Sequence, residues 1–197
     1  MRSRQFWQNT KPMMPELSLN VLDVAENSTK AGAKLVEITV DADTAADRLT
    51  IYIKDDGCGM TKEQVNAVTD PFFTSRTTRK VGLGVPFFKY SAESTGGTFT
   101  IVSEPGAGTE VTASFVLSHI DRMPLGDINA TIHTLIVYHP ETEFLYIYRY
   151  NGKSFTLDTR AFKEILGDIP FNTPEVSGYI QEYLTENKME TDGGAVY

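Results

Sequence analysis

The stretch that decides the fold is Leu49-Thr50-Ile51-Tyr52-Ile53, followed one residue later by Asp55-Asp56-Gly57-Cys58-Gly59-Met60. The first part alternates apolar and polar side chains, which predicts a β-strand with one buried face. The second part ends that strand with a carboxylate and two glycines. A carboxylate can accept a hydrogen bond from the exocyclic amine of adenine, and glycine lets the backbone lie against a flat base because it has no Cβ. The spacing is therefore suited to purine recognition, although taken alone it is equally typical of an Asp-Gly turn.

The segments around this stretch predict a two-layer domain. Helices are predicted from 17 to about 30, from 61 and from 84, and strands at 35–40, 49–53, 98–102 and 110–117. Gly32 is placed to end the first helix, and Thr61 with Gln64 forms a capping box at the start of the second. This order is typical of an α+β two-layer sandwich, in which helices cover one face of a mixed, mostly antiparallel sheet.

The pattern changes after residue 118 and predicts a small C-terminal α+β appendage. Its elements are a helix at 128–138, a hairpin of 144–150 and 154–157 across Asn151-Gly152, and helices at 159–166 and 173–184. Residues from 186 onward are polar and are predicted to fray. Residues 1–14 are polar and unpatterned, which predicts a disordered extension. The predicted organisation is therefore an extension at 1–14, a main domain at 15–118 and an appendage at 119–197.

Composition narrows the class of protein. The chain has 197 residues, 41% hydrophobic and 22% charged, as expected of a globular protein. The net charge of −8 argues against nucleic acid and anionic lipid as partners. Cys58 is the only cysteine, so an internal disulfide and a cysteine-rich metal site are excluded. The sequence contains neither a signal peptide nor an apolar run long enough to span a membrane, so we expect a cytoplasmic protein.

The predicted helix at 17–30 carries polar residues that can handle metal and phosphate. Asp23 lies one turn before Asn27 on the same face. An amide oxygen is a suitable ligand for Mg²⁺ that also holds phosphate oxygens, and a carboxylate can orient or deprotonate a water. Taken alone, these residues are most simply a solvated helix face.

A second candidate for phosphate binding lies at the start of the predicted helix at 84. Val81-Gly82-Leu83-Gly84 offers free backbone N–H groups, which can hold phosphates without net positive charge. Arg76, Arg79 and Lys80 precede it and can close over phosphates as a lid. Each motif is weak by itself, and the basic loop is equally typical of a solvated surface.

The order of these motifs resembles that of the gyrase, Hsp90, histidine-kinase and MutL ATPase superfamily. Over residues 17–117, the helix with Asn27, the Asp55-x-Gly57-x-Gly59 stretch, Pro71-Phe72-Phe73-Thr74, Gly82-Leu83-Gly84 and Gly106-x-Gly108-Thr109 match its N, G1, F, G2 and G3 boxes. The resemblance implies a Bergerat-type ATP-binding fold that takes ATP and Mg²⁺. Residues 118–127 and the appendage are similar to small stand-alone ATP-binding proteins of anaerobic bacteria, which are associated with iron-hydrogenase gene clusters.

The resemblance implies a role for each matching residue. Asn27 would ligate Mg²⁺, Asp55 would bind adenine, Gly59 and Thr109 would support the base, and Gly82 and Gly84 would hold the phosphates. The full predicted nucleotide site is Asn27, Lys30, Asp55, Gly57, Gly59, Met60, Phe73, Thr74, Arg76, Arg79, Lys80, Val81, Gly82, Leu83, Gly84 and Thr109, with Asp23 as the candidate catalytic base.

Two departures from the superfamily pattern shape the expected function. Its ATPases have a glutamate base where this chain has the shorter Asp23, so we expect slow hydrolysis. Histidine kinases carry a helical hairpin with the phosphoacceptor histidine before this domain, and the stretch before Leu17 is too short for one. His119, the first of the three histidines, is predicted to be a linker residue. The chain is thus not expected to be a self-contained histidine kinase.

Three functions remain open. The first is an ATP-binding regulator whose ordered lid is sensed by an unidentified partner protein, or which phosphorylates that partner. The second is an ATPase that uses Asp23 as its base. The third is a degenerate pocket kept for protein interaction, which the intact set of Asn27, Asp55 and glycines argues against.

Overall fold

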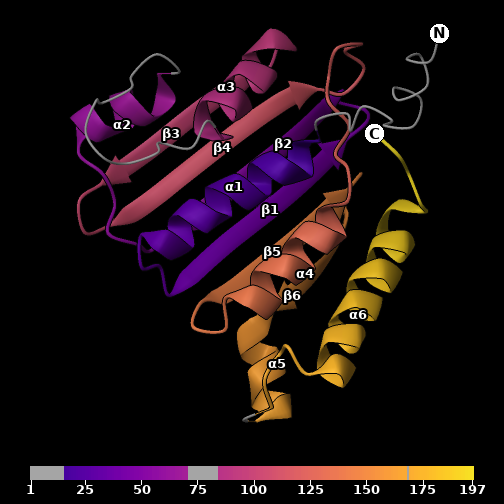
Figure 1. Ribbon diagram of the computed structural model, residues 1–197. Coiled ribbons are helices and arrows are strands. Elements are labelled where there is room, and N and C mark those ends of the chain that lie inside the picture. Colours follow the sequence, from indigo (N-terminus) through magenta and orange to yellow (C-terminus); the bar gives the residue numbers. More distant parts are fainter. Residues whose placement is uncertain (1–15, 71–83, 168) are drawn as a thin grey trace, which may run out of the picture.

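The computed structural model describes residues 16–70, 84–167 and 169–197 (Figure 1). The helices are α1 (Leu17–Lys30), α2 (Lys62–Thr69), α3 (Gly84–Ser94), α4 (Ile128–Tyr138), α5 (Thr159–Leu166) and α6 (Pro174–Asp192). The strands are β1 (Leu35–Asp43), β2 (Arg48–Asp55), β3 (Thr98–Glu104), β4 (Gly108–Val116), β5 (Glu143–Tyr150) and β6 (Lys153–Asp158). The predicted elements are all present, and most of their boundaries differ from the prediction by three residues or fewer.

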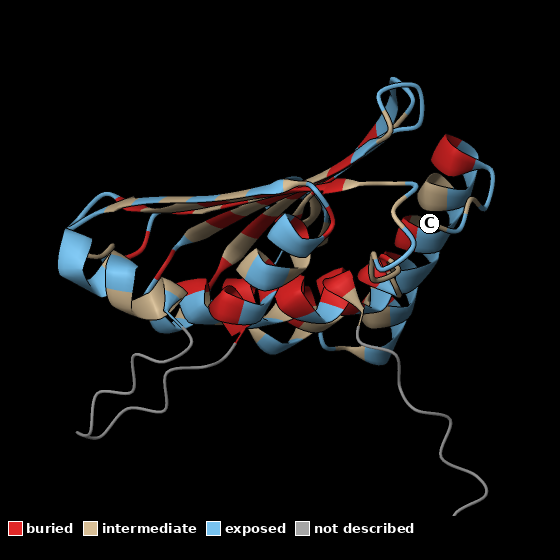
Figure 2. Ribbon diagram, turned by 90° about the horizontal axis from the view of Figure 1, so that it is seen from above, coloured by how far each residue is buried: buried red, intermediate tan, exposed pale blue. Residues whose placement is uncertain are grey.

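The described strands form one six-stranded sheet in the order β3-β4-β2-β1-β5-β6. Neighbouring strands are antiparallel except β1 and β5, which are parallel. Helices α1, α3, α4 and α6 lie on one face of this sheet (Figures 1 and 2). The predicted α+β two-layer sandwich with a mixed, mostly antiparallel sheet is therefore confirmed.

The alternation of buried and less buried residues along β2 determines where the site forms. Successive strand residues point to opposite faces, and in β2 the buried positions are Leu49, Ile51, Ile53 and Asp55. The first three pack in the core beneath α1, with none of them more than 1% exposed. Asp55 is the next residue in the same series, so the strand brings a carboxylate to the helix-covered face at the edge of the apolar core.

The C-terminal part differs from its prediction in length. Helix α6 runs to Asp192, and Thr191 and Asp192 are buried, so the prediction that residues from 186 onward fray is wrong. The physical reason is a polar cluster against β5. The Asp192 carboxylate accepts a hydrogen bond from Tyr148 at 2.6 Å, and Lys188 lies 2.5 Å from it. The ring of Tyr197 stacks on Tyr150.

The sheet continues from the predicted main domain into the predicted appendage. β5 pairs with β1 along eight residues, from Leu35 opposite Glu143 to Ala42 opposite Tyr150. The buried apolar residues of both parts belong to one cluster, which includes Ile38 of β1 and Tyr146 of β5. The division of the chain into a main domain at 15–118 and an appendage at 119–197 therefore stays a prediction.

Candidate functional site

Asp55 is held in a fixed orientation by two hydrogen bonds. Its Oδ2 accepts a hydrogen bond from the Ser28 hydroxyl at 2.6 Å, and its Oδ1 accepts one from the Gly57 amide at 2.9 Å. The residue is only 6% exposed. Each carboxylate oxygen has two lone pairs, so both can still accept a further hydrogen bond from a ligand. A buried, oriented acceptor of this kind is suited to the amino group of a flat heterocycle.

Close packing leaves little room for a side chain at Gly57 and none at Gly59. A Cβ on Gly57 would lie 3.0 Å from both the Ala31 Cβ and the Asp55 Oδ1. Gly59 has a φ of +65°, and a Cβ there would lie 1.9 Å from the carbonyl oxygen of Glu104. The loop between them is anchored on two sides, because the Cys58 amide donates to the Ala31 carbonyl and the Cys58 carbonyl accepts from the Gly106 amide.

The Ser103 hydroxyl organises the other side of the site. It donates to the Gly108 carbonyl at 2.8 Å, accepts from the Met60 amide at 2.9 Å and lies 2.9 Å from the Thr109 hydroxyl. Thr109 is directly opposite Asp55 in the β2–β4 register. The predicted residues Asp55, Gly57, Gly59, Met60 and Thr109 are thus brought together at one end of the sheet.

The predicted polar residues of α1 share its exposed face. Asp23, Asn27 and Lys30 are exposed, whereas Val24, Ala25 and Ser28 are buried against the sheet. This division follows from the helical repeat, which places residues three, four and seven positions apart on one side. The ammonium group of Lys30 lies 3.5 Å from the Glu26 carboxylate, so Lys30 is partly engaged within its own helix.

Gly84 begins α3 directly against α1. A Cβ on Gly84 would lie 2.6 Å from the Asp23 Oδ2, which shows how closely the start of α3 approaches the Asp23 carboxylate. Backbone N–H groups in the first turn of a helix have no partner within the helix and favour anions. An acid, an exposed amide and a helix N-terminus therefore lie along one border of the site.

Glu26 belongs to a different interaction from its neighbour Asn27. The Glu26 Oε1 lies 2.7 Å from the His139 Nε2 at the end of α4. Partial burial acts to raise the pKa of the Glu26 carboxyl, but His139 and Lys30 outweigh it and leave that pKa below its ordinary value. Glu26 therefore connects α1 to α4, while Asp23 and Asn27 remain exposed.

Several predicted residues lie outside the described residues. They are Phe73, Thr74, Arg76, Arg79, Lys80, Val81, Gly82 and Leu83, which include the whole predicted lid. Three described residues had no predicted role. Ser28 orients Asp55, Ser103 connects the loops, and a Cβ on Gly108 would lie 1.9 Å from the Asp55 carbonyl oxygen. Ser28 follows Asn27 directly and Gly108 belongs to the Gly106-x-Gly108-Thr109 motif, whereas Ser103 is identified only by its contacts in space.

Replacing Gly59 with alanine should destabilise the fold more than replacing Gly106. Both glycines have positive φ, but a Cβ on Gly106 would meet no other atom within 4 Å. We expect Gly59→Ala to lower the free energy of unfolding by about 2–3 kcal/mol and Gly106→Ala by about 1 kcal/mol. Urea denaturation of both variants measures this, and equal losses would show that the contact with Glu104 imposes no constraint.

The fold and the arrangement of this site are those of a nucleotide-binding ATPase domain. Residues 13–119 match the family described as histidine kinase-, DNA gyrase B- and HSP90-like ATPase. The chain belongs to this family, and its membership implies that it binds ATP.

Relatives with curated descriptions match only part of the chain. The chain is 34% identical over 111 residues to the sensor protein SrrB of Staphylococcus aureus strains NCTC 8325 and COL. The match covers 54% of this chain and 18% of the relative, so the chain spans less than a fifth of the length of these curated relatives.

Solved structures with a similar fold are more distant. The ATPase domain of MutL from Aquifex aeolicus, complexed with ADP, has a TM-score of 0.47 and 17% identity, covering 78% of this chain and 69% of that one. The N-terminal domain of a DNA repair protein has a TM-score of 0.49 and 13% identity, covering 73% and 52%. Neither likeness is close enough to bear on function.

Among the described helices, none is both long and apolar enough to cross a lipid bilayer.

Proposed function

We propose that this protein is a Mg-ATP-binding regulator that acts on a separate protein partner, either by presenting a nucleotide-dependent state or by transferring the γ-phosphate. The observation that carries the proposal is the Asp55 site. A buried carboxylate at the end of β2 is oriented by Ser28 and Gly57 and retains free lone pairs. The lone pairs that remain can accept a further hydrogen bond from a bound amine, which favours an adenine site.

The residues of the site fit ATP and Mg²⁺ by their chemistry. The Asp55 carboxylate would accept from the adenine amine, while Gly59 and Thr109 would border the base. The exposed Asn27 amide oxygen is the kind of hard ligand that Mg²⁺ takes together with phosphate oxygens. The backbone N–H groups at Gly84 would bind phosphate. ATP supplies the phosphoanhydride bond, and the chain binds and orients it.

A second candidate function is slow ATP hydrolysis with Asp23 as general base. The observation that favours it is the position of Asp23, exposed one turn before Asn27 and in contact distance of the start of α3. Aspartate is one methylene shorter than glutamate, so its carboxylate reaches less far toward a water at the γ-phosphate. This favours slow turnover in the absence of a partner.

The net charge of the protein limits the partners that we propose and is compatible with the location that we propose. With a net charge of −8, the protein should neither bind nucleic acid nor associate with anionic membranes, and we propose that it acts in the cytoplasm.

Incubation with γ-labelled ATP and Mg²⁺, with and without cell extract, tests the proposed function. If the protein transfers the γ-phosphate to a partner, a labelled partner protein should be found only when extract is present. If the protein is a nucleotide switch, ATP should stay bound and little free phosphate should be released. Rapid release of free phosphate by the protein alone would contradict both and would identify an independent ATPase.

Replacing Asn27 with alanine should separate metal binding from base binding. The side chain is exposed and alanine favours helix, so we expect the fold to be kept. Affinity for ATP should fall at least about tenfold with Mg²⁺ and much less with EDTA, since the amide oxygen serves the metal. Calorimetry in both buffers measures this, with Asn172→Ala, an exposed asparagine far along the chain, as the control. Equal losses in both buffers would exclude Asn27 as a metal ligand.

A further inference from the structure

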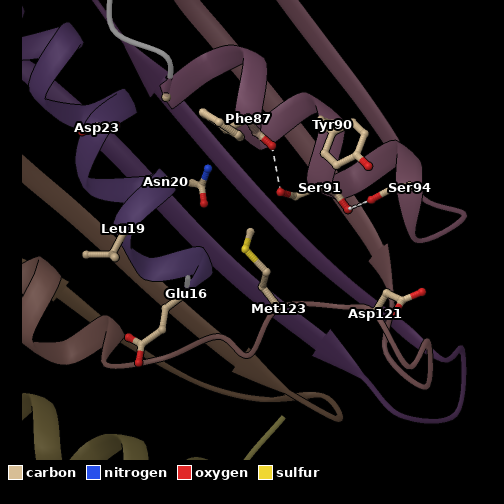
Figure 3. Close-up of a pocket in the computed structure, with 11 residues that line it drawn as sticks. Glu16, Leu19, Asn20, Asp23, Phe87, Tyr90, Ser91, Ser94, Asp121 and Met123 are labelled. Atoms are coloured by element: carbon tan, nitrogen blue, oxygen red, sulfur yellow. Dashed lines mark hydrogen bonds between the residues drawn. The ribbon is translucent and has the colours of Figure 1, made fainter. Parts of the chain in front are cut away.

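A groove of about 580 Å³ runs between α1 and α3 and shares Asp23 and Gly84 with the candidate nucleotide site (Figure 3). Its apolar side chains are Leu19 of α1, Phe87 and Tyr90 of α3, and Met123 from the segment after β4. Leu19, Phe87 and Tyr90 are 44%, 57% and 69% exposed. Exposed apolar side chains gathered from three segments indicate a surface that binds another apolar group.

The charged side chains of the groove all have the same sign. Glu16, Asp23 and Asp121 line it, and none of the described lining residues is a lysine or arginine. The Glu16 carboxylate accepts hydrogen bonds from Ser18 and from the Asp127 amide, both at 3.3 Å, and retains lone pairs for a cation. The groove is therefore complementary to a segment that carries both cationic and large apolar side chains.

Residues 1–15 of this chain have that composition. They include Arg2, Arg4 and Lys11 and no acidic residue. They also include Phe6, Trp7 and two methionines, at 13 and 14. The segment joins the described chain at Glu16, which is itself a lining residue of the groove.

We infer that the groove between α1 and α3 is the binding site of the chain's own residues 1–15, with Trp7 or Phe6 against Phe87 and Tyr90 and the basic side chains against Glu16 and Asp121. This placement rests on the side chains that line the groove and on the composition of the segment, and not on the function proposed for the nucleotide site.

Chain length permits this placement. Trp7 lies nine positions before Glu16, which allows a reach of up to about 30 Å in an extended chain. The groove follows α1 from Glu16 to Asp23, a distance of about 10 Å along the helix axis. A tether this short gives an effective concentration in the millimolar range, so even a weak intrinsic affinity is enough for binding.

Fluorescence of the full chain tests the inference, because Trp7 is the only tryptophan. We expect its emission to lie at shorter wavelength, and its quenching by acrylamide to be several-fold weaker, than in the urea-unfolded chain. Phe87→Ser and Asp121→Lys should each move both readouts toward their unfolded values. Both residues are exposed, so neither variant should disturb the core, and circular dichroism verifies the fold.

Matched controls carry the same substitutions outside the groove. Ile165→Ser, at a position 85% exposed on α5, and Glu141→Lys, at an exposed acid before β5, should leave Trp7 unchanged. Full quenching of Trp7 in the wild type would overturn the inference. Shielding that survives both groove variants would also overturn it, because Trp7 would then bind elsewhere. Shielding that rises with protein concentration would show binding to a second copy and would overturn the intramolecular placement.

Discussion

Asp55→Asn is expected to remove most of the affinity for ATP while leaving the fold intact. The carboxylate can only accept hydrogen bonds, whereas one end of the amide donates and would face the donating amine of adenine. Loss of a hydrogen bond to a charged acceptor costs about 1.5–3 kcal/mol, which corresponds to roughly 10- to 150-fold in the dissociation constant. Calorimetric titration with Mg-ATP measures the difference.

The contacts of Asp55 explain why the variant should still fold. Its amide oxygen can keep accepting from Gly57, and the Ser28 hydroxyl can accept from the new amide group and donate to the Val24 carbonyl, 3.3 Å away. Asp56→Asn is the matched control, because it makes the same charge change one residue later. Asp56 accepts from the amides of Lys34 and Leu35 through one oxygen, which asparagine retains. Equal affinity for ATP in Asp55→Asn and the wild type would remove Asp55 from the adenine site.

Asp23→Asn is expected to leave ATP binding unchanged and to lower ATP turnover by roughly 10²- to 10⁴-fold if the protein hydrolyses ATP, which is the usual contribution of a general base. The amide has almost the same shape as the carboxylate, so the close approach to Gly84 is preserved. Asp23→Glu should raise turnover, because the longer side chain reaches further from α1. Steady-state release of phosphate from Mg-ATP measures both variants.

Two controls make the turnover measurement interpretable. Asp55→Asn identifies any contaminating ATPase, since activity that survives in it does not come from this site. Glu26→Gln neutralises the next acid along α1, which is paired with His139 of another segment, and should leave turnover unchanged. Equal turnover in Asp23→Asn and the wild type would exclude Asp23 as the base and would favour the switch or phosphotransfer function.

Local patterns predicted those parts of the fold that depend on local physics. The capping box of Thr61 and Gln64 is formed at the start of α2. The Asn151-Gly152 turn has both residues at positive φ, as a tight hairpin between right-twisted strands requires. In each case a side chain or a backbone conformation acts within four residues, so the sequence alone contains the information.

Long-range packing could not be predicted in the same way. The parallel pairing of β1 with β5 joins residues about a hundred positions apart, and both strands alternate in a way that also suits other partners. A second example is α3, where the sequence pattern that predicted the helix included Phe87, Phe88, Tyr90 and Ala92. Of these four residues, only Phe88 and Ala92 are buried. Which apolar stripe of a helix faces the core depends on its neighbours, and here the other stripe forms the groove.

The candidate site was predictable as residue types and spacing but not as contacts. Asp55 and its glycines were predicted from one short motif and the superfamily resemblance. Ser28 and Ser103, which orient the carboxylate and connect the loops, carry no distinctive spacing of their own. Serine is common on helices and strands, so its role emerges only when the elements pack.

Comparison of Mg-ATP and Mg-GTP binding to the unmodified full chain by calorimetry tests the central claim most directly. If Asp55 recognises the adenine amine, ATP binds at one site per chain. GTP then binds at least about tenfold more weakly, because guanine presents a carbonyl oxygen where adenine has its amine, so two acceptors face each other and the base gives the carboxylate no hydrogen bond. Comparable affinity for ATP and GTP, or no binding of either, would contradict the account.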